Sequence, residues 1–85
     1  MKKYKCVCCG NNTMNSKAQG SYDICPVCYW EDDIVQYDDP DYDGGANEIS
    51  LNKARENYKR IGAISEKYLS KTRKPFKEEI VDKNT

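Results

Sequence analysis

The chain has 85 residues, of which 14 are Lys or Arg and 14 are Asp or Glu, so its formal net charge is zero. A domain of this size buries only about 60 to 65% of its unfolded surface, and Ile, Leu, Val and Phe together supply just 13 residues. This composition excludes a fold held by apolar burial alone, while the balanced charge argues against a disordered chain. We therefore expect one small domain that needs additional stabilisation by cross-links, either disulfides or a metal ion.

The first element expected is a short strand at residues 4–5, which leads into the cysteine cluster CVCCG at residues 6–10. Gly10-Asn11-Asn12 predicts a turn that closes this cluster, and a polar linker without regular structure follows over residues 13–20.

Residues 21–24 (SYDI) alternate in polarity and predict a second short strand, which delivers the next cluster, CPVCYW, at residues 25–30. This order of turn, strand and turn is typical of a zinc ribbon. The sequence therefore predicts a small α+β domain with a pair of zinc-ribbon-like knuckles, short β-strands and one or two packed helices.

The cysteine spacing indicates a metal site. Cys6 and Cys9 are separated by two residues, Cys25 and Cys28 likewise, and fifteen residues lie between the pairs. This pattern is typical of four-cysteine zinc sites, because a two-residue gap lets both sulfurs meet one ion. We expect zinc as the cofactor, with iron as the alternative, since a tetrahedron of thiolates suits both metals.

The fifth cysteine, Cys8, is left as a spare thiol inside the first turn, because pairing it with Cys6 or Cys9 would make too short a loop. We expect a small buried side chain or an alternate ligand there. The chain has no histidine, and four thiolates leave no open metal position, so we expect no enzymatic activity. Thiol redox chemistry at the CPVC stretch is the remaining enzymatic alternative, although the βαβ context of such motifs is missing.

Residues 31–45 (EDDIVQYDDPDYDGG) are acidic, and Pro40 with Gly44-Gly45 predicts a loop without regular structure. Residues 39–44 resemble the start of a calcium-binding loop, but the twelfth position is Ser50 where a bidentate glutamate is required. We therefore expect an acidic turn whose Asp side chains bond local backbone amides, and no calcium site.

The strongest helix signal lies between Ser50, a natural N-cap, and Gly62, which fits the position after the last turn. Apolar residues recur at helical spacing between these ends, at Leu51, Ala54, Tyr58 and Ile61. Because a helix of about eleven residues is unstable alone in water, its apolar face must dock on the cysteine module and Trp30. A second helical piece is predicted from residue 65 or 66 to 71.

From Arg73 onward the chain is charged, so we expect a domain over residues 1–75 and a flexible tail over 76–85. Residues 1–48 hold four Lys and nine acids, net −5, whereas residues 49–85 hold ten Lys or Arg and five acids, net +5. The acidic loop and the basic side of the helix are the expected interaction surface with a protein partner, at Glu31, Asp32, Asp33, Lys53, Arg55, Lys59 and Arg60.

Nucleic acid is a further partner to consider, since residues 53–77 combine nine Lys or Arg with Tyr58, Tyr68 and Phe76. Tyr58 falls on the apolar face of the helix, however, and the pI of about 6.2 is lower than that of a dedicated nucleic-acid-binding domain. A nucleic-acid-binding zinc ribbon is thus an alternative that the sequence does not favour.

The N-terminal residues MKKYKCVCCG hold no apolar run of signal-peptide length, and no stretch approaches the length of a membrane span. We expect a cytoplasmic protein without membrane association. In that reducing compartment the thiols stay free, which also favours metal over disulfides.

The stretches CVCCG, GSYDICPVCYWEDD, DPDYDGGAN and SLNKARENYKRIG together resemble the bacterial cysteine-rich CPCC domain family over roughly residues 4–75. Val7 stands where the family has its eponymous proline. The resemblance implies a small uncharacterised metal-binding domain and supplies no activity. It points to the cysteine motif Cys6, Cys8, Cys9, Cys25 and Cys28, and to further motif residues Trp30, Gly44, Gly45, Asn47, Ala54, Arg55 and Tyr58.

The CPVC turn also resembles that of rubredoxin, an iron electron carrier, but Tyr29 stands where rubredoxin has glycine. A left-handed backbone is strained for tyrosine, which argues mildly against the iron protein. The expected function is therefore a non-enzymatic zinc-binding interaction module, with a rubredoxin-like iron carrier as an alternative.

Overall fold

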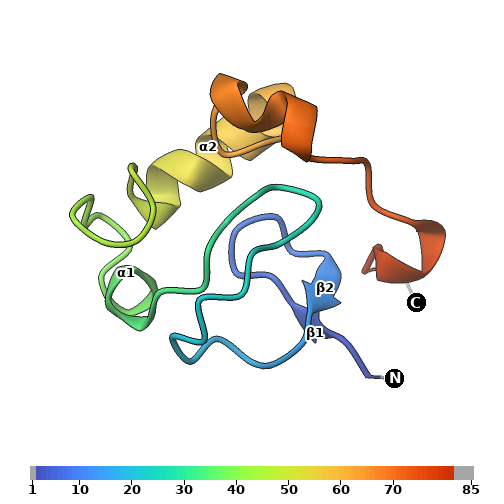
Figure 1. Cartoon of the computed structure of the whole chain (residues 1–85), viewed down its shortest axis with the longest axis horizontal. Helices are drawn as coiled ribbons and strands as arrows, with labels where there is room; N and C mark the ends of the chain where they lie inside the picture. The colour runs from blue at the N-terminus through green and yellow to red at the C-terminus, as the bar shows by residue number, and fades with distance from the viewer. Residues whose placement is uncertain (1, 82–85) are drawn as a thin grey trace.

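The computed structural model describes residues 2–81, and Figure 1 shows the cysteine-bearing N-terminal part lying beneath the longest helix. The fold is α+β, as the sequence predicts. Within residues 2–81, two strands form one antiparallel sheet, and two α-helices and two 3-10 helices follow. In order these are β1 (Tyr4–Lys5), β2 (Asn12–Met14), α1 (Ile34–Asp38), α2 (Leu51–Ile61), η1 (Glu66–Lys71) and η2 (Lys77–Glu79).

The sheet brackets the first cysteine cluster. β1 is the predicted strand, and its Tyr4 pairs with Met14 of β2. β2 occupies residues for which the sequence predicted a turn and an irregular linker, so that prediction was wrong. The physical reason is tertiary: Thr13 and Met14 are buried, although the polar sequence around them carries no alternating pattern.

The strand predicted at residues 21–24 is reduced to a single bridge between Ile24 and Glu31. Further backbone bonds extend the pairing, since Tyr22 N–H donates to the carbonyl oxygen of Asp32 at 3.0 Å. The second cysteine cluster thus sits at the end of a short hairpin.

The acidic segment is not the irregular loop that the sequence predicted, because α1 forms within it. Asp33 caps this helix: its carboxylate accepts hydrogen bonds from the backbone N–H groups of Val35 and Gln36 at 2.8 and 3.2 Å. Pro40 follows directly after the C-cap Asp39 and cannot continue the helix.

A buried amide network holds α1 against the following loop. Gln36 is fully buried, and its side-chain nitrogen donates to the carbonyl oxygens of Tyr42 and Ile49 at 3.0 and 2.9 Å. Its side-chain oxygen accepts from Asn47, whose own side chain bonds both backbone groups of Glu31. Because each partner is satisfied, this polar network orders the segment without apolar mass.

α2 agrees with its prediction to the residue. Ser50 Oγ accepts from the backbone N–H of Lys53, and Gly62 adopts a left-handed φ of 86° while its N–H donates to Tyr58 O. Leu51 and Ala54 are fully buried in one cluster with the cysteines and Trp30. The predicted second helical piece is η1, a 3-10 helix.

The C-terminal segment is described as far as residue 81, and residues 82–85 of the predicted tail lie outside the described part of the chain. Part of the predicted tail has regular structure, namely η2. Arg73 anchors it: its guanidinium bonds both carboxylate oxygens of Glu79 at 2.8 and 2.9 Å and lies 3.8 Å from the ring centroid of Phe76. Within residues 2–81, no helix is long and apolar enough to cross a membrane.

Candidate metal centre

The two cysteine clusters fold into turns with the same hydrogen-bond pattern, which we call knuckles. The carbonyl oxygen of Cys6 accepts from Gly10 N–H, and that of Cys25 accepts from Tyr29 N–H, both at 2.9 Å. The residue after the last cysteine of each knuckle has a left-handed backbone, with φ of 79° at Gly10 and 75° at Tyr29. The spacing of the cysteines thus produces two copies of one local structure.

Tyr29 takes the backbone conformation that the sequence argument treated as unfavourable for tyrosine. That argument against an iron protein therefore loses its basis. The ring of Tyr29 stacks on Tyr68 of η1, with centroids 4.3 Å apart and planes 19° from parallel. Such a stack is worth about 0.5–1.5 kcal/mol beyond burial, which offsets a left-handed strain of about 1–2 kcal/mol.

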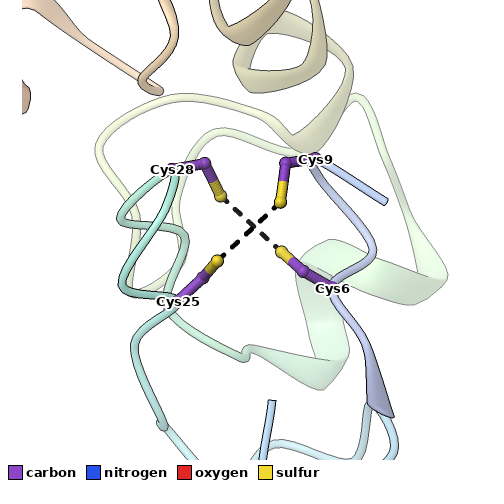
Figure 2. A group of neighbouring side chains, drawn as sticks. All are labelled: Cys6, Cys9, Cys25 and Cys28. Atoms are coloured by element: carbon purple, nitrogen blue, oxygen red, sulfur yellow. Dashed lines mark hydrogen bonds between the residues drawn. The ribbon is translucent and has the colours of Figure 1, made fainter. Parts of the chain in front are cut away.

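Four cysteine side chains point toward one centre between the knuckles (Figure 2). The sulfurs of Cys6, Cys9, Cys25 and Cys28 all lie within 4.8 Å of one another. The Cys6–Cys28 and Cys9–Cys25 sulfur pairs are 3.6 and 3.8 Å apart. A tetrahedral ion with metal–sulfur bonds of about 2.3 Å needs sulfurs about 3.8 Å apart. The four predicted ligands therefore fit a metal ion, and all five cysteines of the chain are free of disulfides.

The protonation state of each of these thiols depends on the neighbouring cysteines. Hydrogen bonds from Cys28 and Cys6, with a further one from Thr13, lower the pKa of Cys25. Hydrogen bonding to the adjacent Cys25 in turn raises the pKa of Cys28, because it favours the protonated thiol of Cys28. Full ionisation of the cluster therefore requires a cation at its centre, and metal binding must release protons.

Two further groups contact the sulfurs from outside. The Thr13 hydroxyl lies 2.9 Å from Cys25 Sγ, and the Trp30 backbone N–H donates to Cys28 Sγ at 3.4 Å. Such partners orient thiolates and offset their charge. Sequence reasoning missed Thr13, because it lies in the linker and only the pairing of β2 with β1 brings it to the site.

Cys8 is not one of the four converging cysteines. It occupies the place in the first knuckle that Val27 has in the second, and both side chains are buried, at 8% and 1% exposure. Cys8 therefore packs as a small apolar side chain in the core.

Two residues of the predicted interaction surface are inside the protein. Asp32 and Asp33 are only 4% and 7% exposed, so their expected place on an exposed surface was wrong. Asp32 accepts three hydrogen bonds, from the backbone of Gln19 and from the backbone and hydroxyl of Ser21. Burial raises the pKa of Asp32, but these hydrogen bonds outweigh it and the pKa is lowered.

The basic residues of α2 divide into two groups. The Arg55 Nε–H donates to the carbonyl oxygen of Val7 at 2.9 Å, so Arg55 braces the first knuckle. Lys53, Lys59 and Arg60 are exposed. Tyr58 packs against the core as the sequence predicts, and its hydroxyl accepts from the side-chain amide of Asn11 at 3.2 Å.

The calcium-like stretch has the local bonding that the sequence predicts for an acidic turn. Asp39 Oδ1 accepts from the backbone N–H of Asp41 at 3.3 Å, and Asp41 Oδ1 accepts from the Asn52 side chain at 2.9 Å. Glu48, at the end of the acidic half, pairs with Lys67 of the basic half.

The chain matches a known protein family. The family model described as "Cysteine-rich CPCC" matches residues 4–79 and confirms the family resemblance found in the sequence. No curated protein matches the chain. The match covers both knuckles, α1, α2 and η1, so it includes every element that contributes to the metal centre.

Proposed function

The chain belongs to the cysteine-rich CPCC family, and we propose that it is a non-enzymatic interaction module held together by one zinc ion. The observation that carries this proposal is the closed arrangement of the four sulfurs of Cys6, Cys9, Cys25 and Cys28. Because thiolates fill all four positions of a tetrahedral ion, no position remains for a substrate. A metal in such a site supports the fold and leaves the function to the surface.

Zinc suits this role because structural zinc contributes about 10–16 kcal/mol to small domains. The proposal also places the protein in the cytoplasm, where thiols remain reduced. Iron stays the second candidate, because the left-handed backbone of Tyr29 removes the sequence argument against an iron protein. Metal analysis and the visible spectrum of purified protein test the choice: zinc protein is colourless, whereas four-thiolate iron gives a red protein.

The surface that we propose for partner binding surrounds α1. Ile34, Val35 and Tyr37 are 39, 54 and 42% exposed. Residues 31–49 contain eight acids and no Lys or Arg. We call the exposed apolar side chains of α1 and the exposed acids next to them the acidic α1 surface, and its members are Ile34, Val35, Tyr37, Asp38, Asp39, Asp41 and Asp43. Apolar contacts with an acidic rim fit a basic protein surface.

Affinity capture with two matched variants tests this surface. One variant changes Asp38, Asp39, Asp41 and Asp43 to Asn, and the control changes Lys53, Lys59 and Arg60 to Gln. Neither set includes a buried side chain, so both variants should keep their metal and their fold. We expect partners captured by the wild type to be lost from the Asn variant and retained by the Gln variant. Retention by the Asn variant would show that the contact lies elsewhere.

A further inference from the structure

One ligand of the metal centre is more accessible than the others. Cys6, Cys25 and Cys28 are 1, 0 and 0% exposed, whereas Cys9 is partly exposed. A groove of about 520 Å³ runs beside the first knuckle, and its volume is in the range of small-molecule sites. Residues that line this groove include Cys6, Cys8, Cys9, Lys5, Arg55 and Tyr37.

The two knuckles also differ in how their sulfurs are protected. In the second knuckle, Cys25 has the Thr13 hydroxyl at 2.9 Å and Cys28 has the Trp30 N–H at 3.4 Å. Within residues 2–81, the hydrogen-bond partner of the Cys9 sulfur is another cysteine, Cys25 at 3.8 Å. Hydrogen bonds to a thiolate lower its basicity, and its nucleophilicity falls with it. Cys9 therefore keeps more nucleophilic character than the ligands of the second knuckle.

Positive charge flanks the same groove. Lys5 is exposed on β1, and Arg55 is fixed beside the first knuckle by its 2.9 Å bond to Val7 O. Reactive cysteines sit in such electropositive, partly exposed surroundings, and positive charge attracts anionic reagents. Exposure, hydrogen bonding and charge therefore all distinguish Cys9 from the second knuckle.

We propose that Cys9 is the modification site of the metal centre, the ligand that soft electrophiles and peroxides attack first while the metal is bound. This inference concerns the chemistry of the centre and is independent of the partner proposed above. With a peroxide, the Cys9 thiolate attacks one oxygen, the O–O bond breaks, and a sulfenic acid and hydroxide form. The Cys25 sulfur is also close to Cys9, at 3.8 Å, but the Thr13 hydroxyl lowers its nucleophilicity. The Cys6 sulfur lies within 4.8 Å of Cys9, so Cys6 attacks the sulfenic sulfur, expels a second hydroxide and forms a disulfide.

The two sulfurs supply the two electrons that reduce the peroxide, and two protons from solvent convert the hydroxides to water. A metal bound at the centre thereby loses two of its four ligands. The product expected is a protein with a Cys6–Cys9 disulfide and, at first, reduced Cys25 and Cys28.

The test uses the metal-loaded full chain with Cys8→Val, which removes the non-ligand thiol that lines the same groove. Cys8→Ala is run beside it, so that poor packing of one replacement cannot obscure the result. Each protein receives substoichiometric N-ethylmaleimide or hydrogen peroxide. Peptide mass spectrometry locates the modified cysteines, and a chromophoric chelator reports metal release.

We expect N-ethylmaleimide to label Cys9 at least about tenfold faster than Cys25 or Cys28, with metal release following that labelling. Peroxide should give the Cys6–Cys9 disulfide first. The proposal is overturned if the first adduct is on Cys6, Cys25 or Cys28, if the four ligands react at equal rates, or if peroxide first joins Cys25 to Cys28.

Discussion

The hydroxyl of Thr13 lies 2.9 Å from the sulfur of Cys25, although Thr13 belongs to neither knuckle. It reaches the metal centre from β2, whose position depends on the pairing of Met14 with Tyr4. The two-stranded sheet therefore does more than support the first knuckle, because it also supplies a hydrogen bond to a ligand of the second.

Thr13→Val should weaken metal binding by about 10- to 100-fold, which is the usual effect of losing an outer partner of a ligand. Valine matches threonine in shape, so the fold should persist. Competition with a chromophoric chelator measures the affinity. Thr72→Val is the control, because the Thr72 hydroxyl bonds Leu69 O in η1 and lies outside the centre. An unchanged affinity for Thr13→Val would mean that this hydroxyl does not stabilise the bound thiolate.

The stack between Tyr29 and Tyr68 should offset the strain of the left-handed backbone at Tyr29. Tyr29→Gly removes the strain, the stack and the contacts of the ring with the core, so its net effect on the unfolding free energy combines one gain and two losses. In a Tyr68→Ala background the stack is already absent, so Tyr29→Gly should be less unfavourable there by about 0.5–1.5 kcal/mol. A double-mutant cycle of urea unfolding on metal-loaded protein measures the difference. Equal effects in both backgrounds would refute the compensation.

Gly45→Ala should destabilise the protein by about 1–3 kcal/mol, as overpacking does. A Cβ at residue 45 would lie 2.6 Å from both Asp33 Oδ2 and Gln36 Cγ, in the buried network that orders α1. Gly44→Ala is a matched control, because a Cβ there would meet the ring of Tyr42, which is 41% exposed and can move away. Thermal unfolding of the two variants should separate them by several degrees; similar melting temperatures would contradict this account of the network.

The knuckles and α2 could be predicted from the sequence because their signals are local. The cysteine spacing fixes each turn, and Ser50 and Gly62 mark the helix ends to the residue. β2 and α1 could not be predicted, because each depends on residues distant in the chain. β2 requires Tyr4 across the sheet, and α1 requires Asn47 to satisfy the buried amide of Gln36.

The same distinction explains the errors at the predicted interaction surface. A run of acidic residues predicts exposure to solvent. The residues that hydrogen-bond the buried Asp32, however, lie more than ten positions away in the sequence, at Gln19 and Ser21. Sequence alone could identify the four converging cysteines but not Thr13, which only the tertiary structure brings to the sulfur. Features set by neighbouring residues, such as the cysteine turns and the ends of α2, could therefore be predicted, whereas the burial of polar side chains could not.

Asp32→Asn should cost about 1–3 kcal/mol at pH 7, because the amide cannot accept all the hydrogen bonds that the carboxylate accepts. The sign follows from the pKa: hydrogen bonds lower the pKa of Asp32 in the folded protein, so its charged form is stabilised by folding. That stabilisation is complete above the ordinary pKa and is lost as the pH falls through the lowered value. Urea unfolding at neutral pH measures the cost, with exposed Asp38→Asn as the control. Equal stability of the two variants would show that the Asp32 bonds contribute nothing net.

Metal removal should abolish cooperative unfolding. Small domains are stable by only about 5–15 kcal/mol, and a structural zinc ion supplies about 10–16 kcal/mol. Removing the metal therefore costs as much free energy as the whole stability of such a domain. Because the ligand thiols must release protons, the metal should also be lost as the pH falls. Circular dichroism during chelation under reductant, and during acid titration, follows both effects. Cys8→Val should behave as the wild type, whereas Cys28→Ser should resemble chelated protein; a metal-free chain that melts cooperatively at the same temperature would contradict the structural role of the metal.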